Sequence, residues 1–322
     1  MLTRRSCMLG MAAAGLQIRP GWAQDFPTRP VTLISPVSPG ASADVTLRAL
    51  AAATEKHLGQ PIIVENMPGA GATMGPARVA ASKNPDGYML TSIFSTAFRM
   101  PFLRKTTFDP STDFTYITGV ARMTIGLVVR SDAPWQTFDA FLAYAKANPG
   151  KISYGTGGVG ITSQVMMAHI AKQLGIDWVH VPFKEGASGT ALLGGFVQAV
   201  ADPAFWAPLV RAGKLRLLVT FGPERTKSWP AVPTLKESGI DIVGDVPYGI
   251  AGPRGMNPSI VKRLQDAFAQ GFQDPAFAAT LTRFNEEPFS LSSAQFHDFA
   301  MSQIAKEKRL VEELGMLGTM GE

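Results

Sequence analysis

The chain has 322 residues, of which 46% are hydrophobic and 17% charged, and its formal net charge is +5. This length exceeds the size at which a single core stops growing, so we expect two domains. The composition is that of an ordinary globular protein, which argues against a disordered chain. Basic residues form no long block and do not alternate with aromatic ones, so we expect no nucleic-acid partner.

Residues 1–23 are predicted to be a secretory signal peptide. Arg4 and Arg5 precede a weakly polar run over residues 6–16, which is too short to span a bilayer as a helix. Small residues around Ala23 suit cleavage at that position. We therefore expect an exported, periplasmic protein, with both the general and the twin-arginine export routes left open.

Cys7, the only cysteine, lies within this signal. The mature chain is therefore expected to lack disulfides, thiolate catalysis and cysteine-bound metals. Loss of Arg4, Arg5 and Arg19 lowers the 30 basic residues to 27 against 25 acidic ones, a net charge of +2. The histidines are far apart and lack metal-site spacing, so we expect structural roles for them and no metal or cofactor. They are His57, His169, His180 and His297.

Strands and helices alternate along the first part of the mature chain. The expected strands are short apolar runs at residues 31–35, 62–65 and 88–93. The expected helices lie at residues 45–58 and 77–81. Glycine-rich loops join them, notably at residues 36–44 and 66–75. This alternation predicts an α/β fold with a parallel sheet covered by helices on both faces.

The pattern then repeats. Further strands are expected at residues 127–130, 152–154, 178–181, 196–201 and 215–220. Further helices are expected at residues 138–147, 163–174 and 205–212. A strand-like stretch at 248–251 follows, and then only helices, at residues 258–272, 276–283 and 293–314. We expect this tail to return to the first unit, so that residues 24–122 and 249–322 form lobe 1 and residues 123–248 form lobe 2.

Two glycine-rich turns, at residues 36–44 and 155–162, each join a strand to a helix. The backbone N–H groups of a helix's first turn lack partners, so such turns can bind an anion. Neither turn contains Lys or Arg, so capture would rest on helix dipoles and hydroxyls and would be reversible. The alternative is that both turns merely begin helices, with Ser42 and Asp44 as caps, and for Asp44 we expect the cap.

Two other kinds of site, a dinucleotide-binding turn and a hydrolase nucleophile turn, fit the sequence less well. Gly155, Gly157 and Gly160 match the dinucleotide pattern G-x-G-x-x-G, with Asp177 downstream, but an oxidoreductase usually carries this turn on its first strand. Segments 40–44 and 186–190 approach the G-x-S-x-G nucleophile turn of hydrolases, yet each lacks the final glycine. We therefore expect a binding protein rather than an enzyme.

An ordered set of short motifs resembles the Bug family, the extracytoplasmic receptors of tripartite tricarboxylate transporters. The resemblance covers nearly the whole mature chain and rests on the segments 27–30, 36–44, 64–71, 85–88, 154–160, 180–183, 192–195, 213–216 and 232–235. It implies a two-lobed periplasmic binding protein fold of the type II kind, each lobe a mainly parallel sheet flanked by helices. It also implies a monomer that closes on a di-, tricarboxylate or aromatic acid by hinge bending and hands it to transporter subunits in the cytoplasmic membrane.

The expected ligand contacts come from both turns and from two further segments. They are Val37, Ser38, Gly40, Ala41, Ser42, Ser95, Thr96, Thr156, Gly158, Gly160, Ile161 and Asp202. A signalling receptor of the same fold and an exported enzyme of unknown class remain alternatives.

The sequence departs from the family pattern at Ala41, Ile161 and Gln164, commonly glycine, serine and histidine. The second turn is thus less polar than usual. With Phe94, Phe98 and Phe205, this favours a ligand whose distal part is apolar or aromatic, although core packing is the default for each aromatic residue, Trp206 and Tyr248 included.

Overall fold

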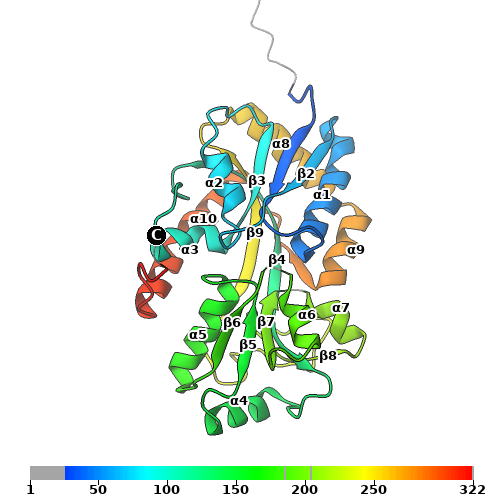
Figure 1. The fold of residues 1–322 in the computed structure, drawn as a ribbon. Helices are drawn as coiled ribbons and strands as arrows, with labels where there is room; N and C mark the ends of the chain where they lie inside the picture. The colour runs from blue at the N-terminus through cyan, green and yellow to red at the C-terminus, as the bar shows by residue number, and fades with distance from the viewer. Residues whose placement is uncertain (1–25, 185, 204, 321–322) are drawn as a thin grey trace, which may run out of the picture.

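The structure is a computed structural model that describes residues 26–184, 186–203 and 205–320. The expected signal peptide lies outside these residues. The described chain folds into two lobes, each an α/β unit whose sheet has helices on both faces (Figure 1). The two-lobed fold expected from the sequence is therefore confirmed.

The lobe drawn at the top of Figure 1, which contains the N-terminal strands of predicted lobe 1, is called the upper lobe, and the other is called the lower lobe. The sheet of the upper lobe has the strand order β2-β1-β3-β9-β4, in which β4 spans Phe114–Arg130. β1 (Val31–Ser35) pairs in parallel with β2 (Ile62–Asn66) and β3 (Met89–Phe94), whereas β9 (Asp245–Pro253) runs antiparallel to β3. β1 is buried along nearly its whole length, as a central strand covered on both faces should be. The helices that follow the first three strands are α1 (Ser42–Leu58), α2 (Met74–Ala80) and α3 (Ser95–Leu103).

The lower lobe is built around a second, smaller sheet. β5 (Ser153–Thr156) pairs in parallel with β6 (Val179–Pro182) and β7 (Ala199–Pro203). β7 and β8 (Leu215–Thr220) each run antiparallel to β4. The helices of this lobe are α4 (Phe138–Ala147), α5 (Thr162–Leu174), α6 (Ser188–Leu193) and α7 (Trp206–Arg211).

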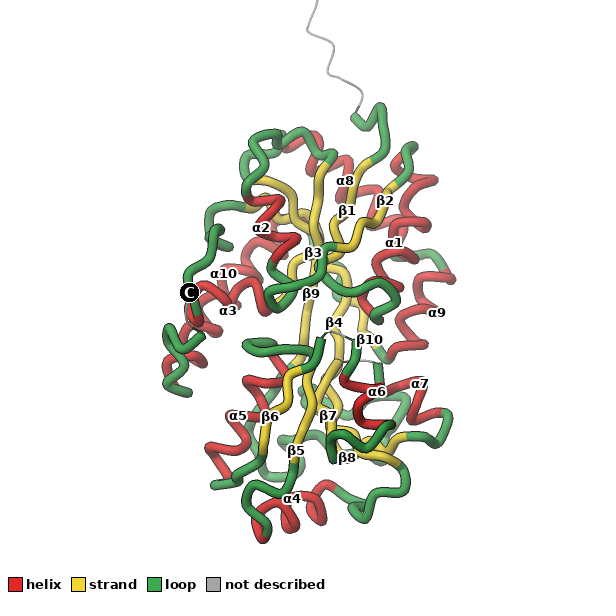
Figure 2. The backbone as a smooth tube through the Cα atoms, viewed as in Figure 1, coloured by secondary structure: helices red, strands yellow, loops and turns green. Residues whose placement is uncertain are grey.

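β4 (Phe114–Arg130) has 17 residues and runs through both lobes (Figure 2). Its first part pairs with β9 and its last part with β7 and β8. The sequence predicted a strand over residues 127–130 alone, because Thr118, Gly119 and Arg122 interrupt the apolar pattern. Register shifts on either side of Thr118 and Gly119 show how the strand continues past these residues.

The C-terminal segment packs on the upper lobe. α8 (Pro258–Gly271) and α9 (Pro275–Phe284) lie against α1, and α10 (Ser293–Glu313) lies against α3 and β4. Asn257, Asp274 and Ser292 cap the N-termini of these helices with their side chains. The prediction that no strand follows α9 is wrong, because β10 (Glu286–Pro288) pairs with β4. Three residues are too few for a strand pattern to show.

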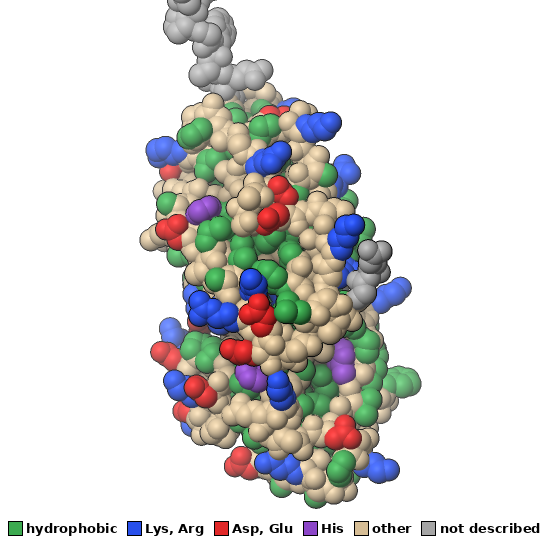
Figure 3. Space-filling model, turned by 90° about the vertical axis from the view of Figure 1, so that its left-hand side faces the viewer, with side chains coloured by type: hydrophobic (Ala, Val, Ile, Leu, Met, Phe, Trp, Pro, Cys, Tyr) green, Lys and Arg blue, Asp and Glu red, His purple; other side chains and the backbone are tan. Residues whose placement is uncertain are grey.

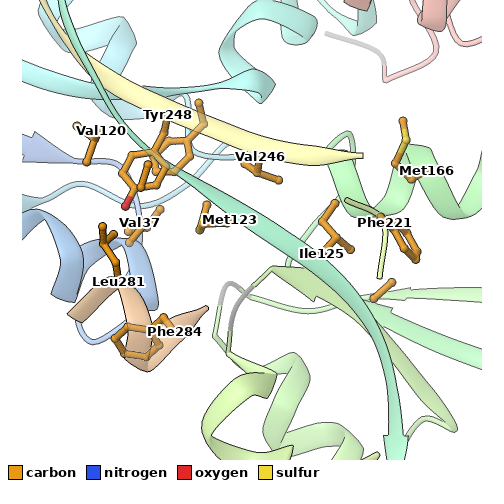
Figure 4. Packing of buried hydrophobic residues seen from close by; sticks show 14 of the residues in the cluster. Val37, Val120, Met123, Ile125, Met166, Phe221, Val246, Tyr248, Leu281 and Phe284 are labelled. Carbon is orange, nitrogen blue, oxygen red and sulfur yellow. The ribbon is translucent and has the colours of Figure 1, made fainter. Parts of the chain in front are cut away.

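One large hydrophobic cluster continues through the junction of the lobes. Met123 and Ile125 of β4 lie beside Val246 and Tyr248 of β9 where the two strands pass from one lobe to the other (Figure 4). All four side chains are buried. The connection between the lobes is therefore a packed pair of strands.

Most other expected elements are present with ends shifted by one to three residues. Two helices were missed. α3 follows β3 without an intervening turn and contains Pro101, a residue that normally argues against a helix interior. α6 is short and begins in the glycine-containing segment 186–189. In both, tertiary packing overrides weak local preference.

Candidate ligand-binding site

The first turn joins β1 to α1 and is held by one buried carboxylate. Asp44 Oδ2 accepts hydrogen bonds from the Gly40 amide at 2.9 Å and from Arg48 Nε at 3.1 Å. Its Oδ1 accepts from Asn66 Nδ2 at 2.7 Å. The prediction that Asp44 caps α1 is wrong: the N-cap residue is Ala41, in an extended conformation and with no side-chain bond, and Ser42, the other cap of the alternative, is the first residue of the helix. Asp44 lies inside the helix and reaches back to brace the turn.

Asn66, the last residue of β2, completes this network. Its amide nitrogen also donates to the Val37 carbonyl at 3.0 Å, and its oxygen accepts from Arg48 Nη2 at 2.7 Å. All these partners belong to the upper lobe. The first turn therefore has a fixed shape whatever the position of the lower lobe.

The glycine-rich loop after β2 forms a second wall of the upper lobe. Ala70 and Ala72 have φ angles of +52° and +62°, which non-glycine residues rarely adopt. Thr73 Oγ1 donates to the Ala70 carbonyl at 2.8 Å and holds this bend. A Cβ at Gly71 would lie 3.7 Å from the Val159 carbonyl, so the loop reaches the second turn. The glycines of this loop mark it in the sequence, but they did not predict that it belongs to the site.

The second turn joins β5 to α5 in the lower lobe. Thr156 Oγ1 lies 2.8 Å from both the Gly158 carbonyl and His180 Nε2. Since a hydroxyl has one proton, it donates to the carbonyl and accepts from the ring N–H. Burial lowers the pKa of His180, which favours the neutral imidazole ring. Gln164 Oε1 accepts from the Gly160 amide at 3.2 Å, so this side chain also holds the turn.

Both turns open onto one cavity of about 540 Å³ between the two lobes. We call this cavity the cleft. Seven of the twelve expected contacts line it: Val37, Ser38, Ala41, Ser42, Thr96, Ile161 and Asp202. The other five are not among its lining residues in the described chain: Gly40, Ser95, Thr156, Gly158 and Gly160. Phe94 and Phe205 line the cleft, whereas Phe98, Trp206 and Tyr248 are fully buried in the core.

Asp202 is a buried carboxyl in the wall of the cleft, near the end of β7. Its oxygens accept from Ser188 Oγ at 2.6 Å and Ser163 Oγ at 3.3 Å, and the Gly157 amide donates to it as well. Burial raises its pKa to about 6, against the opposing effect of these hydrogen bonds. Asp202 therefore ties the second turn to the first residues of α5 and α6.

Several residues that line the cleft were not predicted from the sequence. Lys184 is the one basic side chain among the cleft-lining residues of the described ranges, and it is exposed at the rim. Phe183, directly before it, lies in a segment that carried the family resemblance. Ser188 lies in the near-match to a hydrolase turn, and only the fold shows its bond to Asp202.

A second buried acid lies behind the first turn. Glu286 of β10 accepts a hydrogen bond from Tyr248 Oη at 2.8 Å. Burial raises the pKa of Glu286 to about 7, with hydrogen bonding to Tyr248 opposing the shift. The described part of the chain holds no group of three or more side chains arranged to bind a metal ion.

Comparison with known proteins places this geometry in a family. Residues 46–316 match the family described as "Tripartite tricarboxylate transporter family receptor". The chain belongs to that family. It is 42% identical over 318 residues to the "UPF0065 protein in gbd 5'region" of Cupriavidus necator, an alignment that covers 98% of this chain and 97% of the relative. It is also 28% identical to BugT of Bordetella pertussis, with 98% of each chain covered.

Several solved structures of similar proteins share the fold. The periplasmic binding protein BugD superposes with a TM-score of 0.84 at 27% identity and covers 91% of this chain and 99% of its own. MatC from Rhodopseudomonas palustris, with bound malate, gives 0.81 at 27% identity over 89% of this chain and 100% of its own. An R. palustris protein with adipate gives 0.84 at 25% identity over 90% and 98%. The family expected from the sequence motifs is thus confirmed.

Proposed function

We propose that this receptor captures a small organic carboxylate in the cleft and delivers it to membrane subunits of a tripartite tricarboxylate-type transporter. The observation that carries the proposal is that α1 and α5 both begin at the cleft, one from each lobe. The N-terminal ends of helices favour anions through free N–H groups and the helix dipole. Malate and adipate in the related structures are both acids of this class.

The charges of the cleft support reversible capture. Lys184 and Asp202 are its only charged lining residues in the described ranges, and Lys184 is exposed to solvent. A buried arginine fork, which would hold a carboxylate by strong charge-assisted bonds, is not among the lining residues described. Binding would rest on dipoles and neutral donors, which a transport receptor can release.

The remaining walls are largely apolar. Phe94, Phe183 and Phe205 line the cleft with Met123 and Val246. Apolar walls favour an apolar ligand body, since they cannot satisfy further polar groups. We therefore propose an acid with an aromatic or longer aliphatic body, rather than a small hydroxylated one.

We infer that the two lobes close on the ligand by bending where β4, β9 and β10 meet. Of these, β4 and β9 join the lobes and β10 pairs with β4 in the upper lobe, while the turns lie on either side of the cleft. We retain 24–122 with 249–322 and 123–248 as the proposed lobe boundaries. A bend at the strands would move the second turn relative to the first without altering either sheet.

We also propose that the protein acts as a binding protein without catalysis. Ser163 and Ser188 bond to Asp202, but no histidine is found among the described cleft-lining residues to act as a base between them. His180 is bonded to Thr156 behind the second turn. A signalling or enzymatic role would need an observation that these residues do not provide.

The proposed working location is the periplasm, with a monomer released by cleavage near Ala23. None of the described helices combines the length and the apolar character needed to cross a bilayer. N-terminal sequencing of the protein from a periplasmic fraction tests the cleavage, and a mature chain that still begins at Met1 would contradict it.

A thermal-shift panel of organic acids tests the function. A ligand at about 100 times its dissociation constant should stabilise the protein by about 2.7 kcal/mol. We expect adipate and benzoate-type acids to raise the melting temperature more than malate or citrate. Shifts with malate and citrate alone would overturn the apolar-body proposal, and no shift with any acid would overturn carboxylate binding.

A further inference from the structure

A buried ion pair lies behind the second turn, outside the lining of the cleft. Arg99 of α3 has no exposed surface, and it meets Glu307 of α10 with Nε to Oε2 at 2.7 Å and Nη2 to Oε1 at 2.9 Å. A buried charge is tolerated when it is paired with an opposite charge. Here the Arg99 guanidinium and the Glu307 carboxylate pair with each other through these two hydrogen bonds. Both helices belong to the upper lobe.

The same guanidinium also reaches the lower lobe. Arg99 Nη1 donates to the Gly160 carbonyl at 3.0 Å, and Nη2 donates to Thr162 Oγ1 at 3.3 Å. The planar fork of arginine can bond a carboxylate and other acceptors at once, whereas a lysine ammonium cannot reproduce this geometry. One upper-lobe side chain therefore holds two consecutive parts of the second turn.

These bonds orient the peptide that opens α5. The Gly160 carbonyl and the Ile161 N–H belong to one planar trans peptide, so they point in opposite directions. Since Arg99 fixes the carbonyl on its own side, the Ile161 N–H points away from Arg99. Ile161 caps α5 and lines the cleft. The position of Arg99 thus determines how the start of this helix faces a ligand.

A second cavity of about 370 Å³ separates α3 and α10 from α5, and it shares Thr162 with the cleft. Arg99 and Glu307 lie in its wall. Lys172 Nζ crosses the same boundary to the Glu313 carbonyl at 2.6 Å. Side chains of both charges gather around the middle of this face (Figure 3). The polar contacts between the lobes at this boundary therefore include the two bonds of Arg99 and the single bond of Lys172.

We propose that Arg99 is a positioning residue for ligand binding, which holds the second turn in its binding conformation from the opposite lobe while Glu307 balances its charge. The ligand in this proposal rests on the proposed function, whereas the role of Arg99 in holding the second turn does not depend on it. Arg99 does not line the cleft, so it acts through Gly160, Ile161 and Thr162.

Hydrogen exchange in the protein without added ligand tests this directly. The variant Arg99→Lys keeps the charge beside Glu307 and loses the fork. We expect exchange of the amides in residues 157–163 to rise about tenfold, the effect of one lost hydrogen bond to a charged group. Arg263→Lys is the matched control, because Arg263 Nη2 donates to the Leu58 carbonyl at 2.8 Å within the upper lobe alone.

A merely structural role for Arg99 predicts a different result. Arg99→Lys would then lower the melting temperature, while exchange in residues 157–163 would rise no more than in residues 199–203 of β7 or than in Arg263→Lys. That result would overturn the proposal. Thr162→Val and Thr162→Ser provide a second test that leaves the ion pair intact: we expect faster exchange with valine and restoration with serine, and equal exchange in the two would also overturn it.

Titration with adipate adds a functional measurement. We expect Arg99→Lys and Thr162→Val to weaken its affinity about tenfold, with Arg263→Lys within about twofold of the natural protein and Thr162→Ser weakened less than Thr162→Val. Unchanged affinity in Arg99→Lys would overturn the proposal. Failure of adipate to bind the natural protein would count against the proposed ligand class, and the exchange result would then decide the role of Arg99 by itself.

Discussion

The two turns that face the cleft are alike in form and differ in what holds them. Each has a buried aspartate that accepts from a glycine amide: Gly40 to Asp44 in the first turn and Gly157 to Asp202 in the second. All the bonds described above for the first turn come from its own lobe, whereas Arg99 braces the second turn from the opposite lobe. The first turn is a fixed wall, and the second depends on how the lobes are placed.

The largest expected effect is the loss of the first turn's brace. Asp44→Ala removes the acceptor of three hydrogen bonds at a site with 2% exposure. We expect the free energy of unfolding to fall by about 4 kcal/mol, because the Gly40 and Asn66 amides each lose an acceptor, at roughly 2 kcal/mol for each unpaired donor. Urea unfolding measures it.

The exposed pair of Lys262 and Asp266 gives the control. Asp266→Ala should change the free energy of unfolding by less than about 0.5 kcal/mol. Equal losses in Asp44→Ala and Asp266→Ala would contradict the idea that the first turn depends on its buried carboxylate.

The aspartate of the second turn should make stability depend on pH. Its pKa is about 6 in the folded protein, against an ordinary value of 3.8, so the folded state binds the proton more tightly. The unfolding free energy should therefore fall by about 3 kcal/mol as the pH rises from about 4 to about 6. Unfolding measured across this range should show the fall in the natural protein and its loss in Asp202→Asn.

Glu286, with a pKa raised from 4.5 to about 7, should add a further fall that overlaps the first and extends to about pH 7. Glu286→Gln should remove that part and keep the part due to Asp202. A pH profile that is the same in Asp202→Asn and in the natural protein would show that the second turn's carboxyl does not control it.

A change of backbone in the second turn should abolish ligand response. Gly158 has a φ of +151°, which L side chains rarely adopt, so Gly158→Val should distort the turn. We expect loss of the acid-induced stabilisation of about 2.7 kcal/mol in the thermal-shift panel. Gly213→Val is the matched control, since Gly213 also has a positive φ, with open space around it and a place outside the cleft lining. A normal response in Gly158→Val would move the site away from this turn.

The smallest expected effect comes from the rim. Lys184→Met removes an exposed cation, so affinity for a dicarboxylate should fall by only about threefold at low salt and hardly at all at high salt. Titration with adipate at two salt concentrations measures this. A tenfold loss at both would show that Lys184 binds the ligand directly.

Short-range patterns were enough to predict much of the fold. Apolar runs and glycine breaks indicated most strands and helices, and the ordered motifs indicated the family. The length of β4 was not predictable, because its middle is stabilised by pairing with β9, a strand more than 100 residues away. Pairing partners at such separation leave no periodicity in the strand itself.

The candidate site was also only partly predictable from the sequence. The two strand-to-helix turns could be predicted from their glycines. Seven of the expected contact residues line the cleft. The sequence could not show that Thr156 and Gly160 turn their polar groups to His180, Gln164 and Arg99. Those partners lie on other elements, and only tertiary packing determines which face of a turn they occupy.

β4 also has a consequence for how the protein unfolds. Its 17 residues belong to the sheets of both lobes and pair with strands in each, so melting either lobe would remove hydrogen bonds from a strand that the other lobe requires. Although residues 26–320 make up two lobes, they should lose structure in one cooperative step, as a single thermodynamic unit.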